Sequence, residues 1–375
     1  MNKLLLILII ILLLILNLLQ INNFNYENLT LTPTLTFTLN PTLINLPLYK
    51  YPFIGAHDAI TGSIDNNIET FNIGNKIHTV YQDLIIKINK SIPIIKTQSL
   101  SLLNLYKKGV RFFDLRIDLE KNFKSFLYKI NNDNDLWFHH AAPLIKIDDC
   151  HYLQKLINIA ILEKTVIILY FSHYTKNDEI DIINLINTYL KKNNFINNCT
   201  ILNTDNNNNL QTKMIDFLNK NIYIICILNG KLKYVQDNFN KNISCFINNQ
   251  KCIDNIPNSL EKSTDDLWKQ LKKYMDTSND KYKSHLNNIN NDSSMYITQA
   301  FFQAPTHTLD ILNLLFYTKL NNESVIKVNN DLDLNNKIVN YIIKNNLKSN
   351  VFLFDAIKDN NTILILKKYI ENNIN

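Results

Sequence analysis

Residues 109–118 read GVRFFDLRID, and this stretch says most about the fold of the 375-residue chain. Polar and apolar residues alternate along it, as they do in a β-strand. This alternation places four side chains on one face of the strand: Phe112, Asp114, Arg116 and Asp118. Residues 97–108, just before it, have the leucine spacing of a helix that ends in two lysines and stops at Gly109. A helix followed at once by a strand is typical of an α/β protein.

The same alternation of strand and helix continues in both directions from this stretch. Strands are expected at 51–55, 111–117, 136–140, 165–171, 223–228, 295–298 and 351–354. Helices are expected at 97–108, 149–163, 179–192, 260–275, 309–317 and 335–345. Repeated strand–helix units favour a parallel sheet, either closed into a barrel or doubly wound.

The N-terminus has the pattern of a secretory signal. Lys3 is followed by an unbroken apolar run over residues 4–16, which is short for a membrane span of about 20 residues. We therefore expect residues 1–20 to be a signal peptide or a signal anchor, and residues 21–48 an extended leader. The remaining chain is expected outside the cytoplasm, either secreted or anchored in the membrane of the secretory pathway.

The composition excludes several classes of protein. With 46% hydrophobic and 19% charged residues, the chain can bury a sizeable core. Its net charge of +6 is scattered, which argues against nucleic acid as a partner and is compatible with an anionic surface. Five cysteines without a C-x-x-C pair exclude a disulfide-stapled miniprotein and a structural zinc module.

Arginine is scarce, and its position is therefore informative. Of 39 basic residues only Arg111 and Arg116 are arginines, so a simple point charge is almost always supplied by lysine. Arginine is needed where a planar fork grips an oxyanion such as phosphate. Arg116 is thus a candidate phosphate ligand, with a structural ion pair to Asp114 as the alternative.

Histidines follow two of the expected strands. His57 stands in FIGAHDAITGS (53–63), just past a strand end, where parallel α/β folds carry their active sites. His139 and His140 end the strand in LWFHHAAP (136–143); neighbours on a strand face opposite ways, so at most one enters a site. The alternative for His57 is a turn-capping role, and a zinc site of these histidines lacks supporting spacing. Two imidazoles and a guanidinium suit metal-free cleavage of a phosphodiester.

In this order, the motifs resemble the X domain of phosphatidylinositol-specific phospholipase C, in its small bacterial-like or X domain-containing form. The resemblance covers residues 51–175. It implies a distorted (β/α) TIM-type barrel that forms a single catalytic domain over residues 49–375. It also implies cleavage of phosphatidylinositol, or its glycosyl forms, to diacylglycerol and a cyclic inositol phosphate at a phospholipid membrane surface.

The resemblance also implies roles for individual residues. His57 matches the general base and His140 the general acid. Asp58 matches a carboxylate beside the scissile phosphate, and Arg116 matches the phosphate-binding arginine. Asp355, after the last expected strand, resembles the aspartate that orients the base, with a helix cap as the alternative.

Further head-group contacts are expected from Asp114, His139 and Tyr170. Calcium-dependent relatives place acidic ligands at the positions matching Asp114 and Arg116. The arginine at one of them predicts that the enzyme does not require calcium. We expect no bound metal and no cofactor. The sequence departs from the family pattern at Ala141, where glycine is common, and at Tyr170, where a charged residue is common.

Two other functions remain open from the sequence. One is a non-catalytic lipid-binding or surface protein with the same fold, although the full set of expected catalytic residues argues against it. The other is a barrel phosphodiesterase acting on glycerophosphodiesters or sphingomyelin, whose metal-binding Glu and Asp pair has no match here. We expect a monomer.

Overall fold

A computed structural model describes residues 41–63, 97–123, 134–140, 142–202, 210–228, 256–287, 295–301 and 333–373. The chain divides into two units, 1–40 and 41–375, and the described residues belong to the second. The expected signal segment 1–20 and the expected helix 309–317 lie outside them. Within the described ranges, no helix combines the length and the apolar character that crossing a membrane requires.

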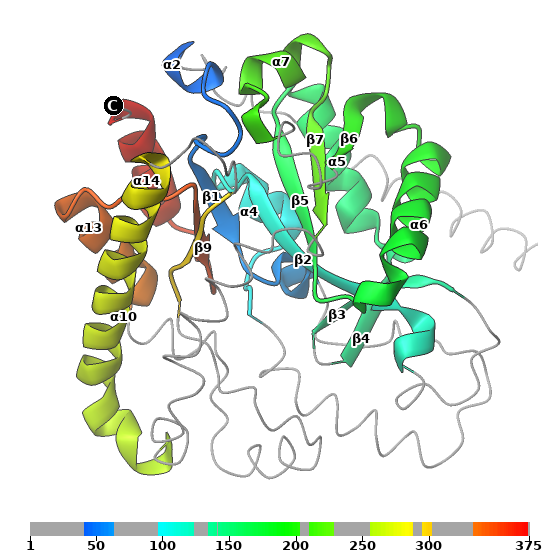
Figure 1. The fold of residues 1–375 in the computed structure, drawn as a ribbon. Helices are drawn as coiled ribbons and strands as arrows, with labels where there is room; N and C mark the ends of the chain where they lie inside the picture. Colours follow the sequence, from blue (N-terminus) through cyan, green and yellow to red (C-terminus); the bar gives the residue numbers. More distant parts are fainter. Residues whose placement is uncertain are drawn as a thin grey trace, which may run out of the picture. The chain divides into compact units, whose positions relative to one another are not determined.

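The centre of the fold is a parallel sheet with the strand order β6–β7–β5–β2–β1–β9–β8 (Figure 1). These strands are β1 (Phe53–Ala56), β2 (Phe112–Leu119), β5 (Ile167–Ser172), β6 (Cys199–Leu202), β7 (Ile224–Leu228), β8 (Ile297–Gln299) and β9 (Val351–Phe354). Two antiparallel strands, β3 (Leu136–His140) and β4 (Ala142–Lys146), extend the sheet from β2. The first and last of the described strands, β1 and β9, are neighbours, so segments about 300 residues apart meet in the sheet.

The sheet curls around an apolar interior. One buried cluster includes Leu202 from β6 and Ile297 from β8, which stand at opposite ends of the strand order. Strands at both edges therefore contribute to the same core, as in a barrel. No pairing joins β6 to β8 in the described part of the chain, so the barrel is distorted and not closed by hydrogen bonds. The expected α/β class is confirmed, with this open, curled sheet as its form.

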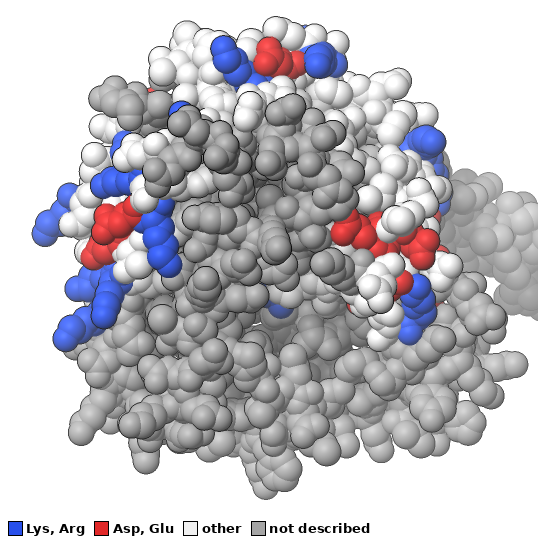
Figure 2. Space-filling view, viewed as in Figure 1, with Lys and Arg blue, Asp and Glu red and all other residues white. Residues whose placement is uncertain are grey.

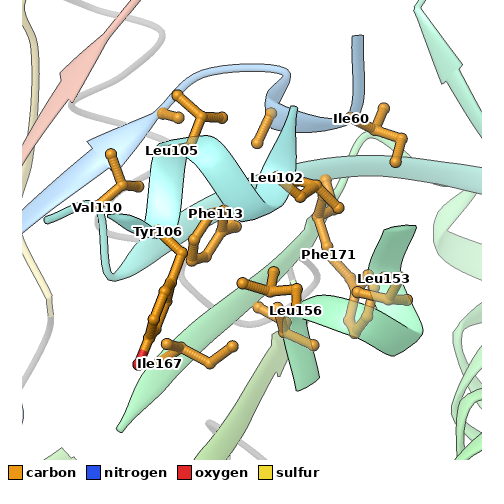
Figure 3. Close-up of a cluster of buried hydrophobic side chains, with 14 of the residues drawn as sticks. Ile60, Leu102, Leu105, Tyr106, Val110, Phe113, Leu153, Leu156, Ile167 and Phe171 are labelled. Atoms are coloured by element: carbon orange, nitrogen blue, oxygen red, sulfur yellow. The ribbon is translucent and has the colours of Figure 1, made fainter. Parts of the chain in front are cut away.

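Helices cover the outer face of the sheet through a second buried cluster. They are α4 (Leu102–Lys107), α5 (His151–Leu162), α6 (Glu179–Lys192), α10 (Ile256–Asn287), α13 (Leu334–Lys344) and α14 (Thr362–Asn372). Figure 3 shows part of this layer, where Leu102 of α4 and Leu156 of α5 face Phe113 of β2. Because one face of each helix is apolar, burying it against the strands fixes the helix on the sheet.

The differences from the expected elements have local causes. Helix α4 begins at 102 rather than 97 because the Ser101 side chain accepts a hydrogen bond from the Asn104 amide and caps it there. Helix α10 is longer than expected. Strands β4 and β6 and helices α7 (Met214–Asn219) and α14 were not predicted. The described fold begins at 41, within the expected leader, with the short helix α2 (Pro41–Ile44) and the fully buried Leu48.

Gly55 offers a test of this interior packing. A Cβ atom at position 55 would lie 2.8 Å from Leu353 Cδ1 and 3.2 Å from Phe112 Cδ1, both in the buried interior cluster. We expect Gly55→Ala to lower the free energy of unfolding by about 1–3 kcal/mol, because the crowded core must shift. Urea unfolding followed by circular dichroism measures the change. The exposed Asn340→Ala in α13 is the control, and equal stability of both variants would contradict the packing described.

Candidate active site

Polar side chains replace the apolar interior at the carboxyl ends of four adjacent strands. His57 follows β1, Asp355 follows β9, Ser172 ends β5, and β2 contributes Asp114 and Arg116. The strands run parallel, so these residues meet at one edge of the sheet. This is the end of a parallel barrel at which active sites are built.

His57 is held by a carboxylate that is 298 positions away in the sequence. Its Nδ1 lies 2.9 Å from Asp355 Oδ1, and the two residues are 3% and 2% exposed. The sequence left two roles open for Asp355: it could orient the base, or it could cap a helix. Its side chain makes the contact that the orienting role requires, while the catalytic role itself stays a prediction.

Arg116 determines where the His57 proton lies. Arg116 Nη2 is 2.8 Å from His57 Nε2. A guanidinium only donates hydrogen bonds, so Nε2 must accept and the ring proton is assigned to Nδ1, which donates to Asp355. Burial, assisted by the Arg116 charge, lowers the pKa of His57, while Asp58 opposes the shift. The imidazole is therefore neutral near pH 7, with a basic nitrogen on the side of Arg116.

Asp58 lies at the centre of the cluster. Its Oδ2 is 3.1 Å from His140 Nε2 and 3.4 Å from His57 Nε2, and its Oδ1 forms an ion pair with Arg116 Nε. The Asp58 oxygens make ionic contacts rather than hydrogen bonds of good geometry. Burial raises the pKa of Asp58, and the charges of Arg116 and His57 oppose that rise. Asp58 also has a left-handed φ of 44°, a conformation that non-glycine residues seldom adopt.

The adjacent histidines of β3 separate as the strand geometry predicts. His140 joins the cluster through Asp58. His139 Nε2 instead donates to the backbone oxygen of His173 at 3.1 Å. Burial lowers the pKa of His139 to about 4, so this ring is neutral. His139 thus braces the loop after β5, and its expected contact with a head group stays a prediction.

Asp114 and Tyr170 are register partners on β2 and β5 but differ in their surroundings. Asp114 accepts hydrogen bonds from Ser172 Oγ at 2.7 Å and from the Asp58 amide at 3.4 Å. Burial, reinforced by Asp58, raises the pKa of Asp114. Tyr170 is 7% exposed and packs within the interior cluster against Phe112. Asp114 is also buried, at 2% exposed, so the predicted substrate contacts of both residues stay predictions.

Two residues position His57 without having been assigned to the site from the sequence. The fully buried Gln98 donates through Nε2 to the backbone oxygens of His57 at 2.9 Å and Phe354 at 2.8 Å. Phe301, just past β8, stacks on the His57 ring with centroids 4.3 Å apart. Gln98 stood out only as part of the motif order, and nothing in the sequence connected Phe301 with His57.

One group of side chains in the described ranges has the spacing of a metal site. Ligand atoms of His57, Asp58 and Asp114 lie within 4.8 Å of one another. Arg116 contacts the first two through Nη2 and Nε. A cation at this place would meet the guanidinium charge, so the donor set as arranged fits a metal poorly.

Comparisons with known proteins give a structural likeness. The chain is similar in structure to bacterial phosphatidylinositol-specific phospholipases C. The enzyme from Listeria monocytogenes aligns at 12% identity and a TM-score of 0.45, over 88% of this chain and 96% of the other. A Staphylococcus aureus structure, from work on membrane binding of its phosphatidylinositol-specific phospholipase C, aligns at 14% identity and a TM-score of 0.45, over 91% and 96% of the two chains. No family model and no curated protein sequence matches.

The Gln98 contacts generate a prediction. Gln98→Met keeps the volume but removes three hydrogen bonds, including the one that Oε1 accepts from the Ile357 amide at 3.2 Å. We expect the free energy of unfolding to fall by about 1–3 kcal/mol, because a buried N–H loses its partner. Thermal unfolding measures this, with Gln154→Met on α5 as the matched control. If the two substitutions have equal effects, Gln98 does not join β1 to β9.

Proposed function

We propose that this protein is a phosphodiesterase that cleaves phosphatidylinositol, or its glycosyl forms, to diacylglycerol and a cyclic inositol phosphate without a metal. The observation that carries the proposal is the pair of imidazoles on either side of one Arg–Asp ion pair. His57 Nε2 lies 2.8 Å from Arg116 Nη2, and His140 Nε2 lies 3.1 Å from Asp58 Oδ2. This arrangement offers a base, an acid and a phosphate ligand within one buried cluster.

In the proposed reaction a hydroxyl of the head group attacks its own phosphorus. His57 Nε2 takes the hydroxyl proton as the new P–O bond forms, and Asp355 stabilises the resulting imidazolium. The P–O bond to diacylglycerol breaks, and His140 gives a proton to the departing oxygen. The Asp58 carboxylate supplies the counter-charge of the His140 imidazolium. Arg116 stabilises the negative charge on the phosphoryl oxygens.

The proposal requires Arg116 to change partners. In the absence of substrate its Nη2 donates to the nitrogen of His57 that must act as base. A bound phosphate offers the guanidinium a charged acceptor, which is a stronger partner than a neutral imidazole. When Arg116 turns to the phosphate, His57 Nε2 becomes available to the hydroxyl. The same guanidinium supplies the positive charge that a calcium ion would provide, so we propose that no metal is needed.

A phospholipid surface is the proposed partner, and the basic side chains are compatible with one. Figure 2 shows Lys and Arg side chains gathered over the flank where α10 and α13 lie, with fewer acidic ones among them. The exposed lysines of these helices include Lys269, Lys273, Lys283, Lys337 and Lys344. Such a surface attracts anionic lipids. The proposed location outside the cytoplasm, either secreted or membrane-anchored, rests instead on the apolar run at residues 4–16.

Turnover of a defined lipid tests the function. The full-length protein is incubated with phosphatidylinositol vesicles, with and without EDTA, and the cyclic phosphate is followed by phosphorus NMR. We expect product in both samples. His57→Ala removes the base, and Arg116→Lys keeps the charge but loses the forked donor, so both should reduce turnover by at least about 10²-fold.

The second arginine provides a matched control. Arg111 donates to the backbone oxygens of Tyr106 and Val110 and lies 3.9 Å from the Tyr106 ring centroid, outside the cluster. Arg111→Lys should therefore lower stability and leave turnover per folded molecule unchanged. Product that disappears with EDTA and returns with calcium would overturn the metal-free mechanism. A folded protein without turnover on either form of the lipid would favour the lipid-binding alternative.

The lowered pKa of His57 predicts the pH dependence. The base must be neutral, so kcat/KM should fall on the acidic side through a pKa below 6.5. Phe301→Leu uncovers part of the ring, which weakens the effect of burial and should move this limb to higher pH. Phe195→Leu, in a buried position away from His57, is the control. An unchanged acidic limb in Phe301→Leu would show that the stacking does not tune the base.

A further inference from the structure

His173 has no part in the proposed chemistry, although it lies beside the cluster that performs it. It directly follows Ser172, the register partner of Arg116 on the neighbouring strand. After burial, the Arg116 charge is the largest cause that lowers the pKa of His173, and His139, His57 and His140 add to it. By its solvent-accessible surface His173 is exposed, and its ring is neutral near pH 7.

The backbone around His173 is fixed from several sides. Its φ of 61° is left-handed, and its backbone oxygen accepts the hydrogen bond from His139 Nε2 at 3.1 Å. Two residues on, Thr175 donates from its amide to Asp118 Oδ1 at 3.3 Å and from Oγ1 to Oδ2 at 3.2 Å. Such a conformation persists where neighbouring contacts enforce it, and it marks candidate functional positions.

A chain of hydrogen bonds determines which nitrogen of His173 carries the proton. Ser172 Oγ lies 2.7 Å from Asp114 Oδ1 and 2.9 Å from His173 Nδ1. The hydroxyl has one hydrogen, which it donates to the carboxylate, so it accepts a hydrogen bond from Nδ1–H. In the neutral ring Nε2 is then an acceptor. Among the described residues, Nε2 of His173 has no hydrogen-bond partner.

We propose that His173 is a substrate-specificity residue whose Nε2 accepts a hydrogen bond from a ring hydroxyl of the polyol head group. This inference rests on the proposed function. A neutral nitrogen without a proton cannot donate to a phosphate oxygen, so a group with a hydrogen to give is the ligand that fits. Ring hydroxyls are such groups, and they stand next to the phosphate that Arg116 would bind. The Asp114–Ser172 pair serves to keep the acceptor on Nε2.

The test compares His173→Ala with the wild type on phosphatidylinositol and on analogues that each lack one ring hydroxyl other than the attacking one. On phosphatidylinositol we expect kcat/KM to fall by about 10- to 100-fold, mainly through KM. For one analogue the two proteins should be equal, because the hydroxyl that contacts His173 is already missing. His173→Gln, whose amide oxygen can take the place of Nε2, should restore part of the loss. The exposed His151→Ala on α5 is the control.

A spectroscopic measurement tests the proton assignment separately. Nitrogen-15 NMR of the His173 ring should report Nδ1–H in the wild type and a mixture of tautomers in Ser172→Ala. An equal loss on every analogue, or Nε2–H in the wild type, would overturn the role of His173 and leave the proposed function intact. If the folded wild type does not cleave phosphatidylinositol, the proposed function fails, and this inference fails with it.

Discussion

The buried carboxylate of Asp58 is the constraint on which the rest of the site depends. An ionised group that is 1% exposed must be compensated by nearby positive charge or by polar hydrogens. Here two groups provide that compensation: Arg116 from β2 and His140 from β3. Each of them is also a group that phosphodiester chemistry needs. The groups that compensate the charge of Asp58 therefore also belong to the proposed catalytic set.

That arrangement is possible because β1 and β9, the first and last of the described strands, are paired in the sheet. His57 and Asp355 are 298 positions apart in sequence, yet their side chains are hydrogen bonded because β1 and β9 are paired in register. Gln98 reinforces this pairing by donating to the backbone at the ends of both strands. Below them, side chains pack so closely that position 55 has no room for a methyl group. The polar side chains of the site thus lie next to a tightly packed apolar interior. This packing limits how far those side chains can move.

The two arginines show how far a compositional argument reaches. Their scarcity drew attention to residues 109–118, and Arg116 lies in the cluster where the proposed reaction would bind a phosphate. Arg111 is as rare but serves the fold: its guanidinium binds backbone oxygens and stacks on Tyr106. Both positions use what lysine lacks, a planar group with several directed donors. Scarcity therefore identifies where a guanidinium is required, and the surroundings decide whether it serves binding or structure.

The sequence by itself determined the local features of this protein. Alternation and helical spacing located most of the described strands and helices, because these patterns reflect which face of each element is buried. Strand alternation also separated His139 from His140, and the positions after strand ends indicated His57 and Asp355. Short elements such as β4 and β6 were missed, because a few residues carry too little periodicity.

Only the tertiary structure decided which distant groups meet. The contact of Phe301 with His57, the link from Asp114 through Ser172 to His173, and the tautomers of both histidines follow from strand order and register. Local spacing cannot report these features, because each depends on atoms that come together only when the sheet curls. The same packing sets the burial that lowers the pKa of His57, the property on which its proposed role as a base depends.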